Sequence, residues 1–195
     1  MKLFEPVYDR VMGWSRHRYA PRYLAGLSLV ESFVLPFPPP DVMLAPMAAA
    51  SPARAWYLAA LTTIASVIGG VLGYLAGWLA FEWLGPWLRD IGYAAELAQA
   101  EDWFATWGVW VVLVAGFSPL PYKLFTITAG ALAMAWLPFV LASLLGRGAR
   151  FFLVALFMAW AGPRAERHLR PYMERIGWAG IGVLAVAIAV YLALE

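Results

Sequence analysis

Five ionisable side chains interrupt apolar stretches of the sequence: Glu31, Asp41, Lys123, Arg147 and Arg150. A charged residue at membrane depth costs roughly 2.5 to 3.5 kcal/mol on insertion scales, so its presence there indicates a functional site. Two acids and three bases can neutralise one another and leave an excess of positive charge. In a water-filled cavity such a group would attract a phosphate, and a carboxylate there could exchange a proton.

Arg147 and Arg150 are three residues apart, so on a helix they share a face and could bind one anionic group together. We therefore predict a substrate and proton pathway at the five charged residues. The alternative is a structural ion-pair network that holds neighbouring segments together.

The composition places these charges in a membrane protein. Of 195 residues, 63% are hydrophobic and 13% are charged, and a soluble core of this size cannot bury so much apolar surface. No short apolar segment with a cleavage site is found at the N-terminus of the sequence, so we expect the protein to stay in the membrane. The absence of cysteine excludes disulfides, iron–sulfur clusters and thiol nucleophiles.

Two of the apolar segments are broken by prolines. Residues 24–50 contain Pro36, Pro38, Pro39, Pro40 and Pro46. Residues 107–133 are interrupted at Pro119, Pro121, Tyr122 and Lys123. Because proline removes a backbone N–H and clashes with the preceding turn, neither segment is expected to form one continuous helix. We predict two re-entrant helical hairpins whose hinges face a polar cavity, with a kinked spanning helix as the alternative for the first.

Three further segments are typical of unbroken transmembrane helices: residues 56–84, 137–161 and 178–194. Gly69, Gly73 and Gly77 are spaced four apart on one face of the first segment. Small residues at this spacing let another helix approach closely, so we predict helix packing at these glycines.

The connecting segments differ in charge. Segment 1–22 is rich in arginine and is expected to be amphipathic on the membrane surface, with a frayed polar tail as the alternative. The predicted loop 85–106 is mainly acidic, and the predicted loop 162–177 is basic. Since arginine-rich loops stay cytoplasmic, two re-entrant hairpins would put the N-terminus and the basic loop in the cytoplasm of a bacterium and the acidic loop outside the inner membrane.

An internal repeat relates the two broken segments. A shift of 82 residues lays Pro39 on Pro121 and Asp41 on Lys123. In this topology the first repeat, residues 24–84, and the second, residues 107–161, begin on opposite sides of the membrane and would be inverted repeats. We predict a single all-α polytopic membrane domain over the whole chain, with two re-entrant hairpins and about three transmembrane helices.

Other chemistries receive no support from the sequence. The two histidines, His17 and His168, lie in basic segments, so neither a metal site nor a histidine base on a spanning segment is expected. The stretch 116–119 lacks the glycine that follows serine in intramembrane serine proteases. We expect no enzyme, no cofactor and no nucleic-acid partner, and take membrane lipid as the anionic partner.

Four motifs occur in order along the chain: ESFVLPFPPPDVML at 31–44, GGVLGYLAG at 69–77, GFSPLPYK at 116–123 and GRGAR at 146–150. Together they resemble the DedA family, also called the SNARE-associated or VTT-domain family, and look closest to its YqaA-like branch. The resemblance covers nearly the whole chain. It implies a small polytopic protein with two facing re-entrant helices that moves phospholipids or undecaprenyl phosphate between leaflets, in some members with proton coupling.

By this resemblance Glu31 and Asp41 match the two membrane-embedded acids of the family. The better-studied branch has two arginines flanking a Pro-Gly pair at the second hairpin. This chain instead has Lys123 for one of them, and Tyr122 in place of a typical hinge glycine.

The predicted function is a flippase- or scramblase-like lipid transporter for an anionic phospholipid or polyprenyl phosphate. Lys123, Arg147 and Arg150, of which the last two resemble basic residues of the family, would bind the phosphate. Glu31 or Asp41 would relay a proton. A secondary transporter of a small solute and a non-transport scaffold are the alternatives, and a homo-oligomer is left open.

Overall fold

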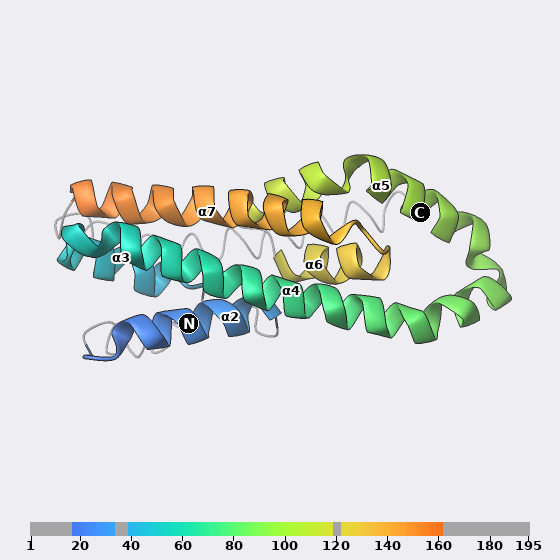
Figure 1. The fold of residues 1–195 in the computed structure, drawn as a ribbon, viewed down its shortest axis with the longest axis horizontal. Coiled ribbons are helices and arrows are strands. Elements are labelled where there is room, and N and C mark those ends of the chain that lie inside the picture. Colours follow the sequence, from blue (N-terminus) through green and yellow to red (C-terminus); the bar gives the residue numbers. More distant parts are fainter. Residues whose placement is uncertain (1–16, 34–38, 119–121, 162–195) are drawn as a thin grey trace, which may run out of the picture.

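The computed structural model describes residues 17–33, 39–118 and 122–161, and all regular structure within them is helical (Figure 1). The elements are α2 (Ala20–Phe33), α3 (Asp41–Ala50), the 3-10 turn η1 (Pro52–Arg54), α4 (Ala55–Leu88), the π-helical turn η2 (Arg89–Tyr93), α5 (Ala94–Phe117), α6 (Tyr122–Ala131) and α7 (Trp136–Ala161). The predicted all-α class is confirmed. Residues 1–16 of the predicted surface segment, the basic loop and the helix predicted at 178–194 lie outside the described residues.

Two helical stretches are long and apolar enough to cross a membrane: Pro52–Trp87, which includes α4, and Trp136–Ala161, which is α7. With a rise of 1.5 Å per residue they are about 54 and 39 Å long, against about 30 Å for the hydrocarbon core of a bilayer. The predicted spanning segments 56–84 and 137–161 lie within them. The two helices run in opposite directions and form the long axis of the molecule (Figure 1).

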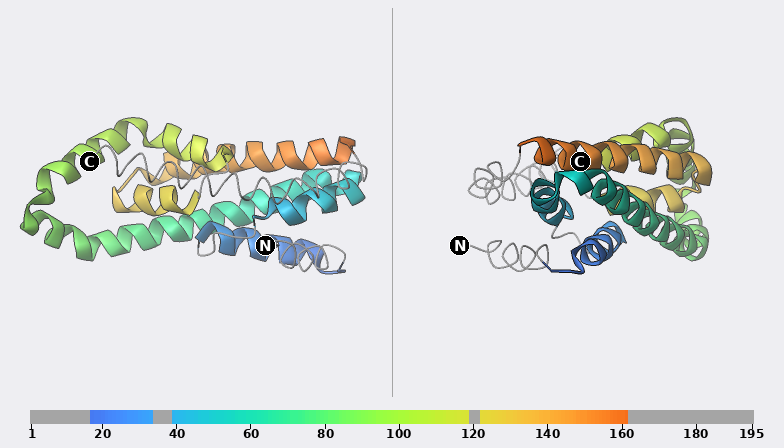
Figure 2. Two further views of the ribbon diagram at one scale, coloured as in Figure 1. Left: turned by 180° about the vertical axis from the view of Figure 1, so that it is seen from behind. Right: turned by 60° about the vertical axis from the view of Figure 1, so that its left-hand side comes forward.

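The four remaining helices lie against this pair in two groups. α2 and α3 lie at the end of the bundle where α4 begins, and α5 and α6 lie toward the end where α4 turns (Figure 2). α2, α4 and α6 run in one direction, whereas α3, α5 and α7 run in the other. Each of the units α2–α3–α4 and α5–α6–α7 thus consists of a pair of helices around an interruption followed by a long helix. Every helix of the second unit runs opposite to its counterpart in the first.

The helix boundaries agree with the repeat in the sequence. α3 and α6 have 10 residues each, and their first residues are Asp41 and Tyr122. α4 and α7 begin at Ala55 and Trp136. Both pairs of starts are separated by 81 positions, one fewer than the shift seen in the sequence.

Both predicted interruptions coincide with helix ends. α2 ends at Phe33 and the next helix begins at Asp41, and likewise α5 ends at Phe117 before α6 begins. Pro40 precedes α3, and its carbonyl accepts hydrogen bonds from two amides of the first turn, at 3.0 and 2.8 Å. Pro46 was counted with the interruptions but lies inside α3, because a single proline removes only one intrahelical hydrogen bond from a helix that packing holds.

The predicted hinge residues divide into two sets. Pro39, Pro40 and Tyr122 are described, and the latter two are buried. Pro36, Pro38, Pro119 and Pro121 lie outside the described residues.

Residues 85–106, predicted to be an acidic loop, are helical. α4 continues to Leu88, the chain reverses through η2, where Gly92 has φ of 105°, and α5 starts at Ala94. The segment contains five alanines, which favour helix. Its charged side chains can stay solvated on a helix surface. An exposed ion pair of 3.4 Å between Arg89 and Glu101 joins the two sides of this reversal.

Glycines determine how closely α2 and α6 approach α4. A Cβ atom at Gly69 would overlap the carbonyl of Leu29 on α2. A Cβ at Gly77 would overlap the carbonyl of Ile127 on α6, and one at Gly73 would overlap a side chain of the same helix. The three predicted packing positions thus lie where α4 meets its two parallel neighbours.

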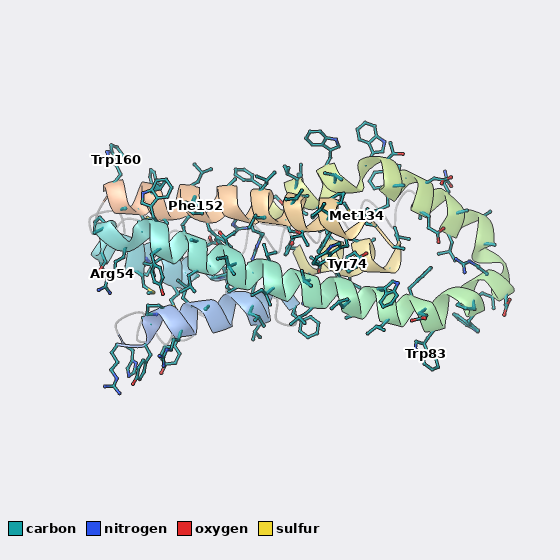
Figure 3. The ribbon with its side chains drawn as sticks, in the orientation of Figure 1. Arg54, Tyr74, Trp83, Met134, Phe152 and Trp160 are labelled. Carbon is teal, nitrogen blue, oxygen red and sulfur yellow. The ribbon has the colours of Figure 1, made fainter. Side chains whose placement is uncertain are left out.

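Aromatic side chains lie at both ends of the long helices (Figure 3). Trp160 and Arg54 lie near one end and Trp83 lies toward the other. Trp136 and Trp160, at the two ends of α7, are 57% and 85% exposed and 24 residues apart, which is about 36 Å along a helix. Because tryptophan concentrates at both membrane interfaces, we take these two residues as markers of the two surfaces.

Candidate functional site

Arg147 of α7 is the centre of a buried polar cluster. Its Nη2 donates hydrogen bonds to Oε2 of Glu31 at 2.8 Å and to Oγ of Ser32 at 3.2 Å. Its Nε donates to Oγ of Ser66 at 2.6 Å. The two serine hydroxyls are also in contact with each other at 2.7 Å, and Arg147 is only 2% exposed. We call Arg147, Glu31, Ser32 and Ser66, with the ring of Tyr122, the inner cluster.

Aromatic rings cover the remaining surface of the Arg147 guanidinium. Its central carbon lies 5.0 Å from the ring centroid of Tyr122 and 4.7 Å from that of Phe151. Such contacts stabilise a desolvated cation by about 2 kcal/mol. A Cβ at Gly70 would lie 2.8 Å from the hydroxyl of Tyr122, so the absence of a side chain at this position of α4 leaves room for the ring.

Arg150 forms a second cluster one helical turn along α7. Its Nη2 donates a short hydrogen bond to Oδ2 of Asp41, and its Nη1 donates to the carbonyl of Ser118 at 2.7 Å. The side chains of Arg150 and Asp41 are each 20% exposed. The second carboxylate oxygen of Asp41, Oδ1, has no hydrogen-bond partner in the described part of the chain. Arg150, Asp41 and Ser118 are the outer cluster.

The two arginines connect the helix ends on either side of the two proline-containing interruptions. Arg147 links Glu31, near the end of α2, to Tyr122, the first residue of α6. Arg150 links Asp41, the first residue of α3, to Ser118 just after α5. The four helix ends that flank the breaks are thus held on one side of α7.

Four of the five predicted charges are therefore brought together in two pairs. Arg147 and Arg150 do share a helix face, but each holds a different carboxylate. The fifth, Lys123, is the second residue of α6 and is partly buried, and its carbonyl accepts a hydrogen bond from Thr126 at 2.9 Å. It adjoins Tyr122, which places it beside the inner cluster.

The sequence analysis missed the two serines that hold Arg147. Ser32 is adjacent to Glu31, and Ser66 lies on the buried face of α4. The available signal was the spacing of Thr62, Ser66 and Gly69 at intervals of four and three residues, which puts polar and small residues on one face of an apolar helix. The carbonyl of Ser118 could not be found in this way, because any residue carries one.

The two arginines lie near the middle of α7. Arg147 is 11 residues from Trp136 and 13 from Trp160, or about 17 and 20 Å along the helix. At the middle of a membrane-spanning helix, a polar site is far from both headgroup regions unless one of the two helix interruptions provides a path to it. Within the described residues, no group of three or more histidine, aspartate or glutamate side chains could hold a metal ion.

The two clusters offer different chemistry. The inner guanidinium is already bonded to two hydroxyls and one carboxylate and is enclosed by two rings. The Arg150 side chain is partly accessible and holds a carboxylate whose second oxygen is buried without a hydrogen-bond partner among the described residues. A planar guanidinium binds carboxylate and phosphate with the same fork of N–H donors, so an anion could replace Asp41 on Arg150.

Comparison with known proteins gives a family and three relatives. The VTT domain matches residues 37–160. Two uncharacterised proteins, from Haemophilus influenzae and Histophilus somni, are 46% and 45% identical over 195 residues, which is all of this chain and all of each relative. Undecaprenyl phosphate transporter A of Staphylococcus aureus is 34% identical over 143 residues, 68% of each chain. No solved structure matches the chain.

Proposed function

Since the chain belongs to the VTT-domain family, also called the DedA family, we propose that it moves an anionic lipid phosphate between the leaflets of the bacterial inner membrane. The substrate class that we favour is a polyprenyl phosphate. The name of the Staphylococcus aureus relative, which the chain matches over 68% of its length, supports that class. The two membrane-length helices support an integral membrane location.

The outer cluster is the observation that carries this proposal. Arg150 and Asp41 lie near mid-membrane, are partly accessible and leave one carboxylate oxygen unpartnered. An incoming phosphate would take the guanidinium from Asp41. The released carboxylate would then be able to relay a proton. Release of the phosphate on the other side would reverse both steps, so lipid and proton movement would be coupled.

The proposed path uses both chain breaks. We treat α2–α3 and α5–α6 as re-entrant hairpins that enter from opposite sides and meet at α7. The opposite directions of the two units and the equal spacing of their helix starts support an inverted repeat. Rocking of one hairpin against the other would expose the outer cluster to each leaflet in turn. Lys123, at the hinge of the second hairpin, would add a second positive charge for the phosphate. The cytoplasmic N-terminus stays part of the proposal.

Leaflet exchange in liposomes tests the function. The full chain is reconstituted in phosphatidylcholine vesicles with a fluorescent polyprenyl phosphate, and the outer-leaflet label is reduced chemically. We expect the protein to make nearly all of the label accessible, and Asp41→Asn to remain folded and inactive. Exchange no faster than in protein-free vesicles, at a density where a known scramblase gives clear exchange, would overturn the proposal.

The same vesicles separate the two alternatives. Uptake of inorganic phosphate without exchange of the labelled lipid would favour a transporter of small solutes. Full stability with neither uptake nor exchange would favour a scaffold whose buried ion pairs are structural.

A further inference from the structure

An apolar groove runs between α5 and α6. It consists of two hollows of about 410 and 690 Å³ that share Trp103, Val111 and Phe125 and therefore adjoin each other. Along α5 the lining extends from Gln99 to Ala115, a distance of about 24 Å. That is most of the hydrocarbon thickness of a bilayer. We call it the α5–α6 groove.

The two ends of the groove differ in charge. The outer end, at Gln99, lies beside the acidic residues Glu101 and Asp102 of α5, of which Glu101 is paired with Arg89. The inner end, at Ala115, lies three residues before Ser118, whose carbonyl holds Arg150.

The α6 wall of the groove brings a second cation to the same end. Its first lining residues, Leu124 and Phe125, directly follow Lys123. The groove thus extends from the acidic residues near Gln99 to the cationic residues Arg150 and Lys123 at its other end.

We propose that the α5–α6 groove holds the prenyl chain of a polyprenyl phosphate whose phosphate lies at the outer cluster. This inference rests on the proposed function and assigns the chain-binding part of its site. The charges favour one orientation. At the Gln99 end a phosphate would meet Asp102 and the Glu101–Arg89 pair, whereas at the Ala115 end it would meet Arg150 of the outer cluster. One groove beside one cationic site suits a lipid with a single chain for each phosphate.

The rings in the groove suit a branched hydrocarbon. Trp103, Trp107 and Trp110 follow one another at intervals of four and three residues, so they form a row along α5. All three are more than half exposed. An isoprenoid chain would contact the row through dispersion, which depends on close packing and not on release of water.

Photocrosslinking tests the groove. p-Benzoylphenylalanine is introduced in place of Thr128, which lines the groove on α6, in the full chain in phosphatidylcholine vesicles with tritiated undecaprenyl phosphate. The matched control is the same substitution at Ala105, an exposed residue of α5 outside the lining. We expect about tenfold more adduct at 128 than at 105, corresponding to about 1.4 kcal/mol of preference. Equal labelling at both positions would overturn the proposal.

Two further lipids separate chain binding from headgroup binding. Undecaprenol has the same chain without the phosphate, and phosphatidic acid has the phosphate with two acyl chains. An excess of unlabelled undecaprenyl phosphate should remove the adduct, and neither of the other two lipids should do so at equal concentration. Competition by all three would mean that ordinary bilayer lipid fills the groove. A crosslink to a second copy, or to residues 162–195 of the same chain, would assign the groove to protein and also overturn the proposal.

A filling variant distinguishes failure of this inference from failure of the proposed function. Ala100→Trp places a large ring in the groove, and Ala105→Trp is its control on the same helix. We expect Ala100→Trp to reduce undecaprenyl phosphate exchange about tenfold and the control to leave it unchanged. Normal exchange with Ala100→Trp, combined with unselective crosslinking, would refute the groove and leave the transporter intact. Selective crosslinking without exchange in any variant would refute the transporter and leave the binding site.

Discussion

The inner and outer clusters contain the same pair of groups, an arginine of α7 and a carboxylate of the first broken segment, in two different environments. Arg147 is 2% exposed and is bonded to Ser32 and Ser66 as well as to its carboxylate. Arg150 is 20% exposed, and its carboxylate keeps one oxygen unpartnered. Only three residues separate the two arginines, so the difference arises from what α2, α4 and α6 place around each.

This difference assigns separate roles. An ion pair whose arginine is buried and also bonded to two serine hydroxyls is hard to open, since the guanidinium would be left without compensation. A partly accessible pair can exchange its anion at lower cost, because water solvates the intermediate. We infer that the inner cluster holds α2, α4, α6 and α7 together and that the outer cluster exchanges carboxylate for phosphate. Four variants test this assignment, in order of decreasing effect.

Arg147→Gln should have the largest effect on stability. It leaves the Glu31 carboxylate, which is 15% exposed, without its counter-ion, at a cost of about 3 kcal/mol in the free energy of unfolding. Unfolding in mixed detergent micelles, followed by circular dichroism, measures the loss. Combining it with Glu31→Gln removes the uncompensated charge and should recover most of the stability. An unchanged unfolding midpoint for Arg147→Gln alone would show that the inner cluster does not stabilise the fold more than the outer cluster.

Arg150→Gln should impair transport more than stability. Removal of a charged hydrogen-bond donor from the phosphate costs about 1.5–3 kcal/mol, so leaflet exchange should slow by about 10- to 100-fold. The unfolding midpoint should fall by much less than with Arg147→Gln. The control is Arg54→Gln, which removes an exposed arginine at one end of the bundle (Figure 3) and should leave exchange unchanged. Normal exchange by Arg150→Gln would remove the basis for the outer cluster as the phosphate site.

Gly69→Ala should disturb the inner cluster through the backbone. The added methyl group would overlap the carbonyl of Leu29 and the Cβ of Ser32, pushing α2 away from α4 at a cost of about 1–3 kcal/mol. Gly26→Ala is the matched control on α2, because no atom lies within 4 Å of its Cβ position. Thermal unfolding of both variants gives the difference. Equal stability would show that α2 can shift without strain and that the inner cluster is less rigid than we infer.

Tyr122→Phe should have the smallest effect. The ring that covers Arg147 is kept, and the lost hydroxyl is buried without a hydrogen-bond partner among the described residues. We expect stability within about 0.5 kcal/mol of the parent chain. Tyr122→Leu removes the ring and should cost about 1–2 kcal/mol through the lost cation–π contact. A large loss of stability in Tyr122→Phe would show that the hydroxyl, and not only the ring, contributes to the inner cluster.

Local chemistry explains which predictions the sequence could support. The prolines after Phe33 and Phe117 removed backbone donors, and helix ends were found at both places. The reversal at 85–106 was predicted wrongly as a loop because its charges were taken to mean irregular structure, although alanine and glutamate favour helix.

Pairing depends on distances that spacing along the chain does not contain. Arg147 and Arg150 were expected to share one anion, since only their common helix face could be read. Their actual partners, Glu31 and Asp41, are 116 and 109 residues away along the chain. No local pattern relates a helix face to a segment at that separation.

Composition and neighbours along the chain were sufficient to predict the membrane class, the all-α fold, the two helix interruptions and the charged residues. Which arginine meets which carboxylate, and which arginine is the more accessible, depends instead on how the helices pack. Burial of a side chain is the sum of contacts from several helices. Here Gly70 leaves room for the Tyr122 ring, and Ser66 approaches from α4. Arg147 is therefore buried, whereas Arg150, one turn away, stays partly exposed.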